Sequence, residues 1–147
     1  MPAVAVLDPA LRALVARTLP AGLAELVPPD RRPGLVVLGP APRPFSPVPG
    51  GTVLLPGRAW RGALPAAAAV GYGPSPRDTL TFSSLGEGKL LLSLQREVVA
   101  LTGRRLDRQE LPLPLLGCPM TTLAWAGTLL LAGAEPESLA ALAGRGV

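Results

Sequence analysis

The stretch VAVLDPALRALVARTLP, residues 4–20, decides the fold class because an apolar run passes directly into a helix-start pattern. Asp8 suits the N-cap of a helix, and Pro9 suits its first position. Apolar residues then recur at helical spacing, at Leu11, Leu14, Val15 and Leu19. We therefore predict a strand followed by a helix that ends near Pro20 and lays one face on a sheet.

Further apolar runs extend this strand and helix into a parallel sheet. The run LVVL at 35–38 lies between Pro-Gly and Gly-Pro pairs, which is typical of a strand buried on both faces. Residues 52–55 and 66–72 are two more strand-like runs, and the proline-rich segment 39–51 predicts a stiff loop. Residues 1–73 thus predict a Rossmann-like α/β fold, with about four parallel strands flanked by helices.

The pattern changes to antiparallel between residues 74 and 116. Polar and apolar residues alternate over 79–83 and 90–95, on either side of the turn Gly86-Glu87-Gly88. Residues 98–101, a Thr102-Gly103 turn and residues 110–115 extend the hairpin into a small meander. Prolines at 112 and 114 restrict its last strand to an edge.

The last part, residues 117–147, predicts two helices within the same single domain of residues 1–147. Thr121 or Thr122 can cap a helix that runs through Leu131 and ends at Gly133. Pro136-Glu137 opens a short helix to Ala143.

Composition excludes several classes of protein. The net charge of +4 comes from scattered arginines, and aromatic residues make up 3% of the chain, so we expect no nucleic-acid partner. The most apolar stretch, 123–134, is shorter than the ~20 residues that span a bilayer. The N-terminus does not resemble a secretory signal, and Cys118 is the only cysteine, so we expect a cytoplasmic protein.

The chain has no histidine, which removes the usual general base, the Ser-His and Cys-His pairs and most zinc sites. The acidic residues are spread singly, and the nearest approach to a cluster is Asp107 with Glu110, which we interpret as a solvated strand edge. We therefore predict no catalytic residue, no metal site and no cofactor, with any cofactor-binding residues unknown.

Two glycine motifs are incomplete as phosphate-binding loops. Gly86-Glu87-Gly88-Lys89 has neither the spacing of a P-loop nor a Ser or Thr after its lysine, and we interpret it as a hairpin turn. Gly71-Tyr72-Gly73-Pro74 follows a strand, as a dinucleotide fingerprint does, but Pro76 replaces the third glycine and both prolines obstruct a helix start.

Cys118 allows two interpretations. It precedes Pro119 just before a predicted helix, where unpaired backbone N–H groups could lower the thiol pKa and create a nucleophile. The alternative, which we favour because no base is available to assist it, is a small buried apolar side chain.

One resemblance to a known family begins at Val70. A strand ends in Tyr72-Gly73, a small antiparallel meander follows, and the run LPLLG at 113–117 leads to a helix, Gly133 and then Pro136-Glu137. This order resembles the later part of the Mur ligase central domain and implies its Rossmann-like core. Gly-Cys-Pro-Met at 117–120 stands where that family has a Gly-x-His-Asn type motif. The family's phosphate loop and Mg²⁺ ligands have no counterpart, so the resemblance implies the core without the ATP chemistry.

Three classes of function remain. We favour a non-catalytic interaction or assembly protein, with a protein partner or self-association. The alternatives are a binding module for a nucleotide or a cell-wall precursor, and a small enzyme that uses Cys118 or carboxylates. We expect any partner contact in the hairpin region 79–115, on a polar and arginine-rich surface made by Ser93, Gln95, Arg96, Glu97, Arg104, Arg105 and Arg108.

Overall fold

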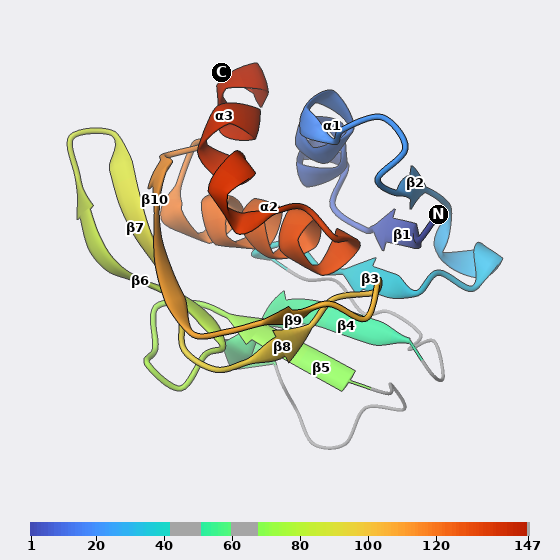
Figure 1. Cartoon of the computed structure of the whole chain (residues 1–147), viewed down its shortest axis with the longest axis horizontal. Helices are drawn as coiled ribbons and strands as arrows, with labels where there is room; N and C mark the ends of the chain where they lie inside the picture. The colour runs from blue at the N-terminus through green and yellow to red at the C-terminus, as the bar shows by residue number, and fades with distance from the viewer. Residues whose placement is uncertain (42–50, 60–67, 147) are drawn as a thin grey trace.

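The computed structural model describes residues 1–41, 51–59 and 68–146. These residues form an eight-stranded, mostly parallel sheet whose order is β10-β7-β6-β5-β4-β3-β1-β2, and a separate two-stranded sheet, β8-β9. Helices α1, α2 and α3 lie together over one face of the large sheet (Figure 1). This architecture confirms the predicted fold class. Most of the predicted loop 39–51, and residues 66 and 67 of the predicted strand, lie outside the described residues.

The parallel part of the sheet has more strands than the sequence predicted. The four expected runs form β1 (Ala3–Val6), β3 (Leu35–Val37), β4 (Thr52–Pro56) and β5 (Ala68–Tyr72). A two-residue strand, β2 (Glu25–Leu26), adds to the outer side of β1, and β6 (Leu80–Gly86) bridges β5 in parallel at its first residue. Two residues are too few to show a period, which is why the sequence pattern missed β2.

The predicted hairpin continues the parallel sheet. Strands β6 and β7 (Lys89–Leu94) are joined at Glu87 and Gly88, whose φ values of 54° and 73° give the type of tight turn that matches strand twist. The meander prediction was wrong in one respect. Strands β8 (Val98–Val99) and β9 (Arg105–Leu106) pair with each other outside the large sheet, and β10 (Gln109–Pro114) returns to pair with β7.

Strand β10 is an edge strand, as its prolines predicted. The Leu115 N–H donates to the Gly88 carbonyl at 2.8 Å, so N–H groups at alternate positions of β10 face β7. Pro112 and Pro114 therefore occupy positions whose N–H would face outward. Because proline has no N–H, this edge offers few donors to an added strand.

Helix α1 (Pro9–Thr18) has the predicted start, since the Asp8 carboxylate accepts a hydrogen bond from the Leu11 N–H at 3.0 Å. Helix α2 (Pro119–Ala132) begins earlier than predicted, at Pro119, and ends at Gly133 as expected. The Thr122 hydroxyl lies inside α2, where it accepts from the Leu116 N–H at 2.8 Å. Thr121 and Thr122 were thus wrong as caps because the rigid φ of proline already starts the helix.

The remaining helical segments are short: α3 (Leu139–Ala143) and the 3₁₀ turns η1 (Pro29–Arg31), η2 (Gly57–Ala59), η3 (Pro136–Ser138) and η4 (Gly144–Gly146). Turn η3 and α3 together confirm the predicted last helix. Within the described part of the chain, no helix has both the length and the apolar character needed to cross a membrane.

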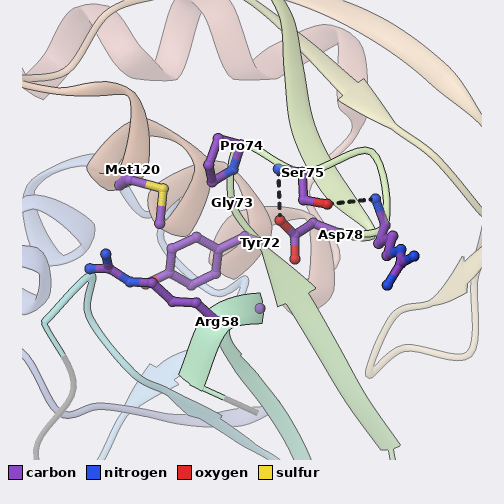
Figure 2. Close-up of a pocket in the computed structure, with 9 residues that line it drawn as sticks. Arg58, Tyr72, Gly73, Pro74, Ser75, Asp78 and Met120 are labelled. Atoms are coloured by element: carbon purple, nitrogen blue, oxygen red, sulfur yellow. Dashed lines mark hydrogen bonds between the residues drawn. The ribbon is translucent and has the colours of Figure 1, made fainter.

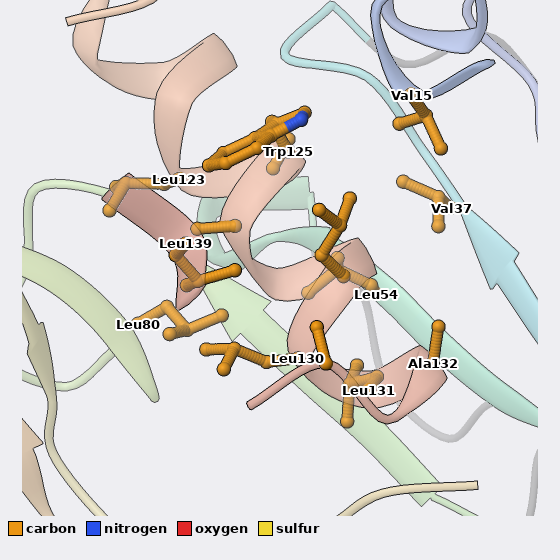
Figure 3. Packing of buried hydrophobic residues seen from close by; sticks show 14 of the residues in the cluster. Val15, Val37, Leu54, Leu80, Leu123, Trp125, Leu130, Leu131, Ala132 and Leu139 are labelled. Carbon is orange, nitrogen blue, oxygen red and sulfur yellow. The ribbon is translucent and has the colours of Figure 1, made fainter. Parts of the chain in front are cut away.

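The core lies between the helices and the sheet, with α2 at its centre (Figure 3). Trp125 of α2 is fully buried, and its indole N–H donates to the Thr18 hydroxyl of α1 at 2.8 Å. The Thr18 hydroxyl in turn donates to the Leu14 carbonyl at 2.9 Å. This chain of hydrogen bonds satisfies the polar groups of Trp125 and Thr18 and fixes α1 against α2.

Candidate functional site

A pocket of about 400 Å³ opens where β4 and β5 end and α2 begins (Figure 2). Carboxyl ends of parallel strands are the usual place for ligands in open α/β sheets. The lining comes from η2, the end of β5 with the segment that follows it, and the first turn of α2. It consists of Gly57, Arg58, Tyr72, Gly73, Pro74, Ser75, Arg77, Asp78 and Met120. Its surface is mostly apolar, with charged groups at a few points.

The Asp78 carboxylate is fixed close to the backbone of the strand ends. Its Oδ2 accepts a hydrogen bond from the Ser75 N–H at 3.1 Å, and the Asp78 N–H donates to the Ser75 carbonyl at 2.9 Å. A methyl group at Gly57 would overlap Oδ1, and one at Gly73 would lie 2.6 Å from Oδ2. Glycine at these two strand ends is what lets the carboxylate lie against the sheet edge.

Tyr72 forms the floor of the pocket. Its side chain is fully buried, and its hydroxyl donates to the Leu38 carbonyl at the end of β3, at 2.6 Å. Burial, with a smaller contribution from the charge of Asp8, raises the pKa of Tyr72 well above its usual value. The phenol therefore stays protonated at neutral pH and acts as a hydrogen-bond donor inside the protein.

Two arginines contribute positive charge to the pocket. The Arg58 guanidinium donates to the Pro40 carbonyl at 3.1 Å, which ties η2 to the end of β3. The Arg77 carbonyl accepts from the Arg96 guanidinium at 2.8 Å, and the same Arg96 nitrogen lies 3.1 Å from the Thr79 hydroxyl. Both lining arginines are exposed, so their charged ends can reach a ligand at the rim.

Cys118 is exposed at the N-cap position of α2, so its interpretation as a buried apolar side chain was wrong. Partial burial raises the pKa of the Cys118 thiol. The thiol donates to the Thr121 hydroxyl at 3.3 Å, and once it is ionised it can accept from that hydroxyl and from the backbone N–H groups of Thr121 and Met120, which outweighs the effect of burial. The net effect lowers that pKa. The thiol is not among the groups that line the pocket.

The other candidates from the sequence are distributed over the molecule. Gly86-Glu87-Gly88-Lys89 is the β6–β7 hairpin turn, as predicted. Gly71-Tyr72-Gly73-Pro74 ends β5, and a turn to β6 follows it instead of the helix that a dinucleotide site requires. Asp107 and Glu110 are exposed near the start of β10, and the described residues contain no group of three His, Cys, Asp or Glu side chains placed to hold a metal.

The predicted arginine-rich surface is partly paired within the molecule. Arg104 forms a salt bridge with Glu135, and Arg105 lies 3.7 Å from Glu97. Arg96 braces the segment after β5, and the Ser93 hydroxyl is buried and accepts from Gln95 at 2.7 Å. These side chains therefore do not form one continuous free basic patch.

The sequence analysis missed Asp78 and Arg58 as site residues. The available indication was that Gly73 directly follows a predicted strand, that Gly57 lies two residues after another, and that charged residues come soon after both. Glycines at neighbouring strand ends predict close approach by another group, but one sequence does not say which group approaches.

Comparison with known proteins adds no family: neither the scan against protein-family models nor the search of curated proteins gives a match. The resemblance to the Mur ligase central domain therefore stays a prediction.

Proposed function

We propose that the chain is a non-catalytic binding module on a Rossmann-like scaffold, and that it binds a small ligand with an anionic group. The observation that supports it is the pocket at the carboxyl ends of β4 and β5, where two exposed arginines border an apolar lining. A phosphate or carboxylate would accept hydrogen bonds from Arg58 or Arg77, and the apolar lining formed in part by Pro74 and Met120 would hold the body of the ligand.

Binding without reaction fits the state of the groups at this site. The Tyr72 hydroxyl is committed to the Leu38 carbonyl, and its raised pKa keeps it from acting as a base at neutral pH. The Asp78 carboxylate is held by the Ser75 N–H against the strand ends. Neither group is paired with a nucleophile among the hydrogen bonds of the described residues.

Titration calorimetry with GMP, UMP and UDP-N-acetylglucosamine tests this proposal. We expect saturable binding of at least one probe, weakened about tenfold or more in the Arg58→Ala, Arg77→Ala double variant because the charge-assisted hydrogen bonding to the anionic group is lost. The matched control is Arg31→Ala with Arg108→Ala, which removes the same charge from exposed positions that do not line the pocket. Equal binding by wild type and the pocket variant would contradict an arginine-bordered site.

A second candidate is the interaction or assembly protein that the sequence favoured. The observation for it is the β6–β7 hairpin, which extends beyond the helices in Figure 1 and carries Leu85 with 49% of its surface exposed. Leu85 also lines a groove of about 350 Å³ with Leu90, Leu91 and Pro112, so this part of the hairpin offers several apolar side chains to a protein contact.

Sedimentation velocity on wild type and Leu85→Lys tests self-association at this tip. If copies of the chain meet there, wild type sediments as an oligomer, and the charged side chain shifts it toward the monomer. A monomer at all concentrations in both proteins would remove self-association through Leu85. Leu91→Lys and Glu87→Lys are not suitable controls because both residues line the same groove as Leu85. Val99→Lys makes the same change at another half-exposed apolar residue, outside that groove, and tests the effect of charge alone.

A further inference from the structure

Asp78 is a charged group without an ionic partner among the described residues. Asp78 is largely buried, with 9% of its surface exposed. The salt bridges found in the described residues join Arg104 to Glu135 and Arg105 to Glu97, so neither involves Asp78. One carboxylate oxygen, Oδ2, accepts from the Ser75 N–H, whereas no described donor is hydrogen-bonded to Oδ1. Oδ1 does not belong to the fully buried side-chain atoms without a partner, which in the described residues consist of the Thr81 hydroxyl. Because Asp78 lines the pocket, Oδ1 can accept a hydrogen bond from a molecule bound there.

The two lining arginines do not supply that donor. Arg58 directs a guanidinium nitrogen to the Pro40 carbonyl, and neither Arg58 nor Arg77 lies within salt-bridge distance of Asp78 in the described part of the chain. In Figure 2 the Tyr72 ring occupies the middle of the group, with Asp78 on one side and Met120 on the other. The pocket therefore has a hydrogen-bond acceptor, the Asp78 carboxylate, in its wall, and two guanidinium groups that form no salt bridge with this carboxylate.

We propose that Asp78 selects the ligand by accepting a hydrogen bond from a neutral N–H or O–H group on the ring of the ligand, while an arginine at the rim of the pocket holds the phosphate of the ligand. The inference rests on the proposed function and adds the class of ligand: a phosphorylated ring compound with a donor edge. A nucleobase and a ribose both have that chemistry. A phosphorylated ring without a donor would cover Oδ1 and leave it unpaired.

Titration with four probes tests the inference: GMP, UMP, ribose 5-phosphate, and phenyl phosphate, which has a ring and a phosphate but no donor on the ring. We expect the wild type to bind the best donor probe about 10- to 100-fold more tightly than phenyl phosphate, the range for a hydrogen bond to a charged group. Preference for GMP or UMP over ribose 5-phosphate would place the donor on the base, and equal affinity would place it on the ribose.

The variant Asp78→Asn keeps the size of the side chain and an oxygen for the Ser75 N–H, but it replaces the other oxygen with a donor. It should remove the preference for donor probes and leave phenyl phosphate binding unchanged or stronger. Asp107→Asn, at an exposed position outside the pocket, is the matched control. The wild-type comparison needs no variant, so a poorly folded Asp78→Asn protein does not prevent the test.

The outcomes separate the two proposals. Equal wild-type affinity for phenyl phosphate and the donor probes, or an unchanged preference in a folded Asp78→Asn protein, would overturn the role of Asp78 and leave the arginine-bordered site in place. Absence of binding by every probe would overturn both.

Discussion

The two ends of the parallel sheet are built differently. At the amino end, the β8–β9 hairpin folds back onto the core. The Leu101 N–H donates to the Leu131 carbonyl at 2.8 Å, and a methyl group added at Gly34 would lie 3.6 Å from the Leu101 side chain. At the carboxyl end, Asp78, Arg58 and Arg77 surround an open pocket. One end thus contributes stability through aliphatic burial, whereas the other holds charged side chains around a pocket.

The largest effect on stability should come from the amino end of the sheet, which the β8–β9 hairpin closes. Leu106 of β9 lies in the main core, with 3% of its surface exposed. Leu106→Ala should lower the free energy of unfolding by about 2–5 kcal/mol, the range for large-to-small changes in a core. Urea unfolding measures this change, and ligand titration of the folded variant should give wild-type affinity. A loss near zero would mean that the hairpin does not close the core.

The second largest effect should come from the carboxyl end of the sheet, where the pocket opens. There, Gly57→Ala forces the new methyl group against the Asp78 carboxylate. Such overpacking should cost about 1–3 kcal/mol in the free energy of unfolding. Unlike Leu106→Ala, it should also weaken ligand binding because Asp78 must move. Gly86→Ala is the control, since nothing lies within 4 Å of its new methyl group. Similar losses for the two variants in urea unfolding would argue against the close approach at Gly57.

The same contrast explains which parts of the fold the sequence predicted. The first strand, the Asp8-Pro9 helix start, the Glu87-Gly88 turn and the edge position of β10 all depend on local residue chemistry, and each was predicted. The separate β8–β9 sheet was not, because alternation and a turn predict a hairpin without saying which surface it packs on.

The candidate site was predicted less well than the fold. Gly71-Tyr72-Gly73-Pro74 was singled out for an incomplete dinucleotide motif, and part of it does line the pocket, for a different reason: Gly73 admits the Asp78 carboxylate. Asp78, Arg58 and Met120 come together only through the order of β4 and β5 and the placement of α2. Contacts between segments so far apart in the sequence have no local pattern.

A smaller effect concerns the reactivity of Cys118, which lies near the carboxyl end of the sheet but outside the pocket. Because hydrogen bonds from Thr121 and Met120 lower the pKa of the Cys118 thiol, the exposed cysteine should react with iodoacetamide in the native protein at neutral pH. Thr121→Val removes the hydroxyl donor, so the thiol pKa should rise and alkylation should slow a few-fold. The rate as a function of pH, followed by mass spectrometry, measures both. A native Cys118 that reacts only after denaturation would contradict its exposed position.

The smallest effect on stability should come from the salt bridge between Arg104 and Glu135, at the amino end of the sheet. Both side chains are largely exposed, at 42% and 55%. The Arg104 hydrogen bond lowers the pKa of Glu135, so the pair stabilises the fold above the ordinary pKa of a glutamate, and this contribution is lost as pH falls through the lowered value. Arg104→Ala should therefore change the midpoint of urea unfolding only slightly at pH 6, and less still at pH 3 or in 0.5 M salt. A loss as large as that of Leu106→Ala would show that charge pairing, and not aliphatic burial, closes the amino end of the sheet.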